Sequence, residues 1–133
     1  MSDTVNLTPD GGVTKRILVA GTGTQAPKGR EVRVHYVGSF HDGPNVGQIF
    51  DSSRKKGREF KFPLGQGRVI SGWDLGVASM NKGEKCVLVC KAPYAYGDRG
   101  AGDIIPPGAT LEFEVELFGW EGDEPASPKC QLA

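Results

Sequence analysis

Apolar and polar positions alternate most clearly near the end of the chain. Leu111, Phe113, Val115 and Leu117 are separated by single glutamates. Because successive side chains of a strand point to opposite faces, this pattern predicts an antiparallel strand over residues 110–118, with one buried and one hydrated face. Shorter segments rich in β-branched and aromatic residues predict further strands over residues 13–19, 31–39, 48–50, 60–62 and 85–91.

Residues 72–80 are the one convincing helical segment. Trp73, Val77 and Met80 recur at helical spacing and share one side, while Ser71 is suited to an N-cap. This apolar stripe would cover the buried face of the sheet. The pattern therefore predicts an α+β domain in which an antiparallel sheet packs on one short helix, with a cavity between them.

Length and composition set the domain organisation. The chain has 133 residues, enough for one folded domain, which we place at residues 13–120. Residues 1–12 and 121–133 are polar or rich in proline and glycine, and we expect flexible tails there. Sixteen basic residues balance sixteen acidic ones, so no net charge favours nucleic acid as a partner.

The first residues lack the basic and apolar blocks of a signal peptide, so we expect a cytoplasmic protein. Its three cysteines are expected to be reduced. Cys86 and Cys90 fall on one face of a predicted strand, about 13 Å apart, which is too far for a disulfide. No set of further ligands accompanies them, so no metal site is predicted and both are assigned to the core.

A glycine-rich segment at residues 21–26 formally matches a dinucleotide-binding fingerprint. That motif must open directly into a helix whose N-terminus meets the pyrophosphate. Here Pro27, Gly29 and a β-branched run from Val32 predict a loop and then a strand. A nucleotide-dependent oxidoreductase is therefore disfavoured, and no cofactor is expected.

Several short blocks occur in a fixed order between about residues 13 and 120. They are His-Tyr at 35–36, Phe-Asp-Ser-Ser-Arg at 50–54, Phe-Lys-Phe at 60–62, Leu-Gly at 64–65, Val-Ile-Ser-Gly-Trp at 69–73, Tyr-Ala-Tyr-Gly at 94–97, Ile-Ile-Pro-Pro at 104–107 and the alternating strand at 109–117. In this order they resemble the FKBP-type peptidyl-prolyl isomerases, which bind macrolide immunosuppressants. The resemblance implies a half-wrapped antiparallel sheet around the helix.

The resemblance also implies a proline-binding pocket. Matching positions would supply residues that act on the substrate, namely Phe50, Asp51, Trp73 and Tyr96, and residues that bind substrate or drug, namely Tyr36, Phe60, Val69, Ile70, Ile105 and Phe113. Trp73 would form the floor, and the Ile70 N–H and Tyr96 hydroxyl would bind substrate carbonyls. Without the resemblance, the apolar members of this set would be assigned simply to the core. Phe62 has no matching role and is assigned there.

Asp51 and His35 are polar residues close to the predicted pocket. In much of the family an arginine orients the acid that Asp51 matches, but the corresponding position is Lys56, and Arg54 and Arg58 are alternatives. His35 alternates with Val34 and Tyr36, so it should point away from the pocket. We expect a structural role for it rather than that of a general base.

The implied function is acceleration of rotation about Xaa-Pro bonds in client proteins, together with binding of tacrolimus and rapamycin. A phosphatase or a kinase could then bind the drug complex, and we expect a monomer. The alternative is a non-catalytic or chaperone-associated module that binds proteins through the pocket rim. Segments 42–47 and 98–103 shape that rim and differ from the shortest family members.

The chain ends Cys-Gln-Leu-Ala, with Cys130 fourth from the end, which matches a C-a-a-X signal for farnesylation. Gln131 is not aliphatic, and Lys129 is the only basic residue close by. A single lipid chain anchors weakly, so even a modified chain would associate weakly with a membrane. Modified and unmodified forms both stay open at this point.

Overall fold

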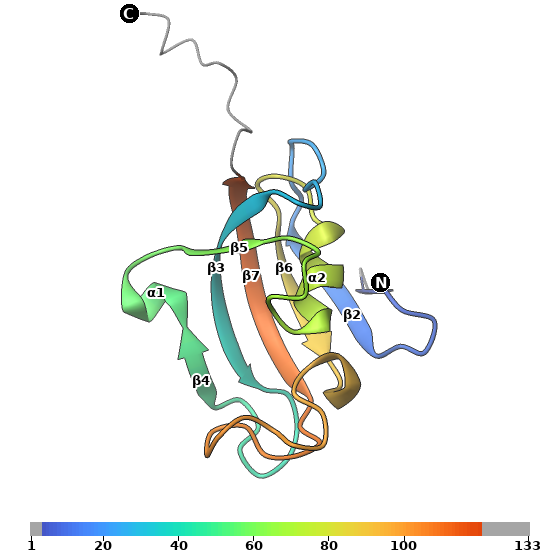
Figure 1. Ribbon diagram of the computed structural model, residues 1–133, viewed down its shortest axis with the longest axis vertical. Coiled ribbons are helices and arrows are strands. Elements are labelled where there is room, and N and C mark those ends of the chain that lie inside the picture. Colours follow the sequence, from blue (N-terminus) through green and yellow to red (C-terminus); the bar gives the residue numbers. More distant parts are fainter. Residues whose placement is uncertain (1–3, 121–133) are drawn as a thin grey trace, which may run out of the picture.

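The computed structural model describes residues 4–120, which form one antiparallel sheet with the main helix packed on one face (Figure 1). The sheet has seven strands in the order β1-β2-β6-β7-β3-β4, and β5 also pairs with β3. The strands are β1 (Thr4–Asn6), β2 (Val13–Val19), β3 (Glu31–Phe40), β4 (Ile49–Ser52), β5 (Phe60–Pro63), β6 (Lys85–Cys90) and β7 (Leu111–Trp120). The helices are α1 (Ser53–Lys56), α2 (Ser71–Ala78) and the 3-10 turn η1 (Ala92–Tyr94). The predicted α+β class, with a half-wrapped sheet around one main helix, is confirmed.

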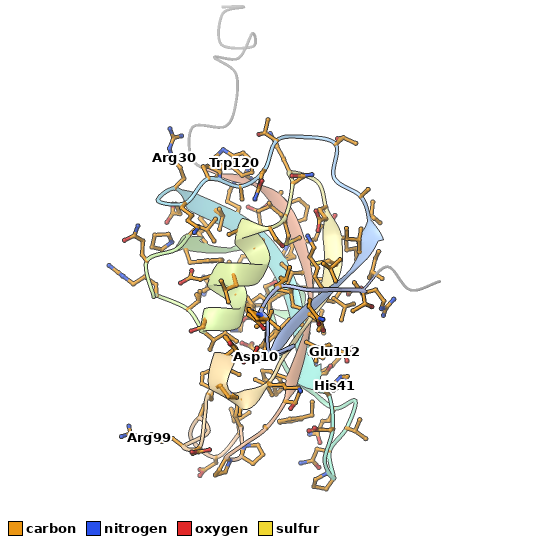
Figure 2. The ribbon with its side chains drawn as sticks, turned by 90° about the vertical axis from the view of Figure 1, so that its right-hand side faces the viewer. Asp10, Arg30, His41, Arg99, Glu112 and Trp120 are labelled. Carbon is orange, nitrogen blue, oxygen red and sulfur yellow. The ribbon has the colours of Figure 1, made fainter. Side chains whose placement is uncertain are left out.

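Strand β7 lies in the middle of the sheet, between β6 and β3. Its four alternating apolar residues are buried, and the glutamates between them are partly exposed, as the sequence pattern predicts. At one end of this strand, His41 Nδ1 lies 2.9 Å from Glu112 Oε1 (Figure 2). The His41 N–H also donates to the Thr110 carbonyl at 3.0 Å, so the turn after β3 is tied to the start of β7.

Helix α2 packs closely on β6 because two of its residues have no side chain. A Cβ atom at Gly76 would lie 2.5 Å from Leu88 Cδ1, and one at Gly72 would overlap Cys90 Sγ. Between these glycines and the sheet there is no room for a larger residue. Trp73 and Val77 are buried on the same helix.

The start of α2 differs from the sequence-based prediction. Ile70, not Ser71, occupies the N-cap position, and no side chain caps the helix there. Asp74 instead accepts hydrogen bonds from the N–H groups of Gly65 and Gly67, at 2.9 and 3.0 Å. The carboxylate in the first turn therefore fixes the preceding loop rather than the helix end. Met80 is fully buried as predicted, but it lies just beyond the helix.

The predicted N-terminal tail over residues 1–12 is too long. Strand β1 pairs with β2, and buried Thr8 accepts hydrogen bonds from the N–H groups of Gly12 and Val13. Main-chain pairing of this kind holds a polar segment whose side chains give no strand signal. The predicted tail at residues 121–133, including the proposed lipidation site Cys130, lies outside the described residues.

One edge of the sheet is divided between two short strands. β5 pairs with the first half of β3 and β4 with the second half. Between them the one-turn helix α1 lies beside the sheet (Figure 1). Ser52 caps α1 by accepting from the Lys55 N–H at 3.2 Å, and Gly57 ends it with a φ of 76°. Four residues are too few to show a helical period, so the sequence did not predict α1.

Both cysteines of β6 are free thiols in the core, as predicted. Burial raises the pKa of Cys86 and of Cys90 to about 12, so both stay protonated at neutral pH. Within residues 4–120 no three metal-ligating side chains cluster together. No helix in that same range is long and apolar enough to span a bilayer.

Candidate functional site

A cavity of about 350 Å³ opens between the sheet and α2. Its lining contains nine of the ten positions for which a pocket role was predicted, with Lys56 and Arg68 in addition. The lining residues are Tyr36, Phe50, Asp51, Lys56, Phe60, Arg68, Val69, Ile70, Trp73, Tyr96 and Phe113. Segments far apart in the sequence therefore meet at one place in the fold.

Ile105 is the predicted position that does not line the cavity. Its side chain is 4% exposed and belongs to the hydrophobic core. Its N–H and carbonyl pair with Ala101, at 3.0 and 2.8 Å. Ile105 therefore braces the loop that follows Tyr96, and its predicted contact with a ligand stays a prediction.

Trp73 forms the floor of the cavity from the first turn of α2. Its side chain is 5% exposed, and its ring meets those of Tyr36 and Phe113 edge-on, with centroids 4.9 and 5.3 Å away. Phe60 makes a third edge contact at 5.7 Å. Edge-to-face contacts hold each ring in a fixed orientation. The buried Trp73 Nε1–H has no hydrogen-bond partner among the described residues.

A glycine on β3 allows two aromatic walls to meet. A Cβ at Gly38 would lie 2.8 Å from Phe50 Cζ and 2.9 Å from Phe113 Cε1. These two rings cross over Gly38 and contact each other edge-on, with centroids 5.8 Å apart. Gly38 was not among the residues predicted to form the pocket. A glycine within a strand pattern is a signal of close approach that could have identified it.

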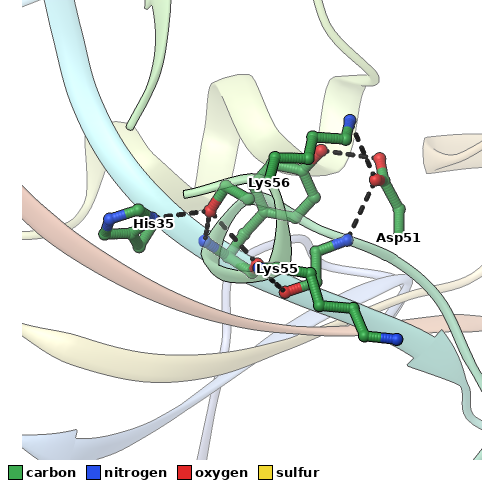
Figure 3. Close-up of polar contacts among 7 residues, drawn as sticks. His35, Asp51, Lys55 and Lys56 are labelled. Carbon is green, nitrogen blue, oxygen red and sulfur yellow. Dashed lines mark hydrogen bonds and ion pairs between the residues drawn. The ribbon is translucent and has the colours of Figure 1, made fainter. Parts of the chain in front are cut away.

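Asp51 is the one anionic residue of the lining, and three donors hold it (Figure 3). Tyr36 Oη donates to Asp51 Oδ2 at 2.6 Å, while Lys56 Nζ and the Ser52 N–H reach Oδ1 at 3.1 and 2.9 Å. Arg54, one of the alternatives, is paired with Glu116 instead. Lys56 is therefore the basic residue that orients Asp51.

These contacts fix the charges inside the cavity. Burial acts to raise the pKa of Asp51, but the hydrogen bonds from Tyr36 and Lys56 and the charge of Lys56 outweigh it, so the pKa lies below its ordinary value. Burial, and then the bond to Asp51, raise the pKa of Tyr36 well above 10. Burial and the Asp51 charge also raise the pKa of Tyr96. At neutral pH the cavity therefore holds a carboxylate and two protonated phenols.

Two donors at the cavity are available to a ligand. Within residues 4–120, neither the Ile70 N–H nor the Tyr96 hydroxyl has a hydrogen-bond partner. Tyr96 is 41% exposed and follows η1, whereas Ile70 sits in extended backbone immediately before α2. A ligand carbonyl in the cavity could therefore accept a bond without displacing one within the protein.

His35 points away from the cavity, as predicted. Its Nδ1 lies 2.8 Å from Ser53 Oγ (Figure 3). Its ring packs edge-on against Phe118. Ser53 Oγ also accepts from the Tyr36 N–H at 2.7 Å. His35 thus helps to fix the start of α1 and the backbone beside Tyr36.

The lining contains no serine, cysteine or histidine that could act as a nucleophile. It offers aromatic faces, two unpartnered donors and one oriented carboxylate. Such a site can bind an apolar ring and align neighbouring carbonyl groups without forming a covalent bond. The glycine-rich segment at residues 21–26 is followed by a turn and β3 rather than by a helix, which agrees with the rejection of a dinucleotide site.

Comparison with known proteins gives a consistent result. The sequence model of the family described as FKBP-type peptidyl-prolyl cis-trans isomerase matches residues 22–118. FK506-binding protein 1 of Dictyostelium discoideum is 50% identical, over 80% of this chain and 96% of that protein. FK506-binding protein 59 of Drosophila melanogaster is 48% identical over 90% of this chain. The solved structure of AtFKBP13 superposes with a TM-score of 0.78 at 36% identity, covering 87% of this chain and 98% of the other.

The relatives differ greatly in length. The chain spans 27% of the Drosophila protein and between 26% and 32% of three other relatives, one fungal and two mammalian. Its similarity to those proteins therefore concerns one part of each of them.

Proposed function

The chain belongs to the family of FKBP-type peptidyl-prolyl cis-trans isomerases, and on that premise we propose that its cavity accelerates rotation about Xaa-Pro bonds in client proteins. The observation that carries this proposal is the buried Trp73 ring at the floor of an aromatic cavity whose lining has no serine, cysteine or histidine. The planar indole gives an apolar surface on which a proline ring can pack. The reaction needs no cofactor, because no bond to another atom forms.

The physical basis is the loss of amide resonance during rotation. The barrier to rotation of a peptide bond is about 18–20 kcal/mol, because the planar amide has partial double-bond character. The twisted transition state has less charge separation than the planar amide. A dry aromatic cavity therefore favours the transition state over the ground state, and this difference in binding is what increases the rate.

Each lining residue has a role in this scheme. The proline ring lies on Trp73, with Tyr36, Phe60 and Phe113 as walls and Val69 closing one side. The Ile70 N–H and the Tyr96 hydroxyl bind carbonyls on either side of the rotating bond. Ile105 contributes indirectly, by bracing the loop after Tyr96. These assignments are consistent with the two unpartnered donors at the cavity.

Asp51 and Phe50 act at the rotating carbonyl itself. The Asp51 carboxylate, oriented by Tyr36 and Lys56, sets the electric field at that carbonyl. Phe50 lies next to Asp51 and contacts Phe113, so it keeps water away from this side of the cavity. A fixed charge in a partly buried site acts more strongly than the same charge in bulk water.

We also propose that tacrolimus and rapamycin occupy the same cavity. The support is the name of relatives such as FK506-binding protein 1, together with the aromatic lining and the free donors. A drug bound on Trp73 would exclude a prolyl peptide, so binding and catalysis would compete. This competition gives the proposal a direct test.

The test measures the cis-to-trans rate of a short Xaa-Pro peptide with wild type, Trp73→Ala and Asp51→Ala, each with and without rapamycin. Circular dichroism establishes that each variant is folded. Acceleration that rapamycin abolishes, and that falls in both variants, supports catalysis at this cavity. Absence of acceleration by folded wild type contradicts it.

A second function is a binding module without catalysis. It is favoured by the observation that this chain matches only about a quarter to a third of several longer relatives. Tight rapamycin binding without acceleration in the same experiment would support this function over the first.

A further inference from the structure

The charged side chains that line the cavity and the hollow beside it are not balanced. The lining contains Asp51, Lys56 and Arg68. A shallower hollow of about 270 Å³ adjoins it, sharing Phe50, Asp51 and Lys56 and adding Lys55. Together the two hollows have three cationic side chains and one carboxylate.

Only one of these cations is neutralised. Lys56 is paired with Asp51 at 3.1 Å, and Figure 3 shows its side chain directed toward the carboxylate while the Lys55 amine extends away without a contact. Arg68 is exposed and, within residues 4–120, forms no ion pair. Asp74 accepts hydrogen bonds from the N–H groups of Gly65 and Gly67 and forms no ion pair with Arg68. Lys55 and Arg68 are therefore cations at the mouth that no ion pair within residues 4–120 holds.

Lys55 and Arg68 lie beside the proposed position of the substrate proline. Phe50 and Asp51 form part of the wall of both hollows. A proline on Trp73 therefore places a neighbouring residue of the same peptide at the shallower hollow or at the mouth beside Arg68. An anionic side chain there would meet Lys55 or Arg68, whereas a cationic one would be repelled.

We infer that this basic mouth selects Xaa-Pro segments in which a residue flanking the proline carries an anionic group, either a carboxylate or a phosphoryl group. The inference rests on the proposed function and names the substrate class of the same site. Because Lys55 and Arg68 are exposed, each contributes weakly, and together they give a preference of about three- to tenfold.

The experiment compares isosteric peptides that differ only in charge. In one pair the residue before the proline is Glu or Gln, and in a second pair the residue after it is Glu or Gln. A phosphoserine and serine pair separates phosphoryl from carboxylate recognition, since the phosphoryl group has a charge of about −1.5 to −2. Isomerisation rates and peptide dissociation constants are both measured, each as the ratio of the anionic to the neutral peptide.

Wild type should prefer the anionic peptide of at least one pair by about three- to tenfold at low salt, and about 0.5 M salt should largely remove this preference. In the double variant Lys55→Gln, Arg68→Gln, the ratio of the anionic to the neutral peptide should fall to about one. In Arg68→Glu the ratio should fall further. Arg16→Gln is the matched control, because Arg16 is an exposed residue of β2 that lines neither hollow. Its ratio should equal that of wild type.

The two proposals fail in different ways. If wild type turns over the neutral peptides and the ratio is one in both rate and affinity for every pair, the basic mouth selects nothing and only this inference is overturned. If no peptide is turned over, the proposed catalysis fails, and the ratio of dissociation constants still decides the inference. A preference that persists in the double variant also overturns it.

Discussion

The space between α2 and the sheet is closed at one part and open at another. Where α2 crosses β6, Gly72 and Gly76 let the helix approach Cys90 and Leu88 until no gap is left. Where the same helix faces β3 and β7, Trp73 meets Tyr36 and Phe113 edge-on, and a cavity of about 350 Å³ stays open.

The difference shows how one short helix can both complete a core and form a binding site. Small residues permit close packing, which excludes ligand and water. Large rings held edge-on cannot fill the corners between them, so the surface they form is rigid and concave. Substitutions at the two parts should therefore have different consequences, and four predictions test this.

The largest effect is expected at the floor of the open part. Trp73→Ala removes a buried ring that contacts four others, and should lower the free energy of unfolding by about 3–5 kcal/mol. It should also reduce isomerisation at least about tenfold, since the proline loses its contact surface. Urea unfolding and peptide kinetics measure the two effects.

Trp73→Leu serves as a second variant, because it retains apolar volume and should stay folded. Its rate should still fall well below that of wild type. A Trp73→Leu protein with the wild-type rate would show that the ring is needed for packing alone.

The next effect is expected at the closed part. Gly76→Val places methyl groups where a Cβ alone would lie 2.5 Å from Leu88 Cδ1, and should lower the free energy of unfolding by about 1–3 kcal/mol. The rate per folded molecule should be unchanged, because Gly76 does not line the cavity. Leu75→Val is the control for β-branching, since Leu75 is exposed on the same helix. Equal destabilisation by both substitutions would contradict the close-packing argument.

A smaller effect is expected at Gly38, which allows the walls of the open part to meet. Gly38→Ala must displace the rings of Phe50 and Phe113, at a cost of about 1 kcal/mol, with a rate loss of a few-fold. The matched control is Ser39→Ala, at the next residue of β3, which should alter neither stability nor rate appreciably. Wild-type kinetics in folded Gly38→Ala would mean that the positions of these rings do not matter.

The smallest effect is expected from pH. The pKa of Asp51 is lower in the folded protein than in the unfolded chain, where it is about 3.9. The contribution of Asp51 to the free energy of unfolding is therefore complete above about pH 3.9 and is lost as the pH falls through the folded-state pKa. The pKa of Tyr36 is higher in the folded protein than in the unfolded chain, where it is about 10. The contribution of Tyr36 to the free energy of unfolding is therefore complete below about pH 10 and is lost as the pH rises through the folded-state pKa. Between about pH 5 and 9 neither group titrates, and the rate should be flat.

Tyr36→Phe sharpens the pH prediction. It removes the hydrogen bond that helps to lower the pKa of Asp51, so the acid limb of the rate profile should move to higher pH. Rate profiles of wild type and variant on one peptide provide the comparison. A bell-shaped wild-type profile centred near neutral pH would require another titrating group.

Much of this architecture could be predicted from the chain itself. The alternation in β7 and the spacing of Trp73, Val77 and Met80 depend only on which face of an element is buried, and both predictions are confirmed. Strand β1 could not be predicted, because its three residues are too few to show a period and all of their side chains are exposed, so that main-chain bonds to β2 hold it. The one-turn α1 was too short to show a period.

The sequence predicted which residues line the site better than it predicted the contacts that each of them makes. Family resemblance identified nine lining positions, but periodicity alone would have assigned the same apolar residues to the core. Lys56 could not be distinguished from Arg54 or Arg58, because the choice depends on Arg54 pairing with Glu116 on another strand. The predicted role of Ile105 stays a prediction, since its side chain is buried in the core and its main chain pairs with Ala101.

The central claim is that the open part both binds the proline and speeds its rotation. One NMR measurement tests both at once: the exchange between cis and trans signals of a prolyl peptide at equilibrium, followed together with the Trp73 indole N–H signal. We predict that substoichiometric protein accelerates the exchange and that the indole signal shifts as peptide is added, with rapamycin abolishing the acceleration. An indole shift without faster exchange would contradict the account and leave a pocket that binds proline without turning it over.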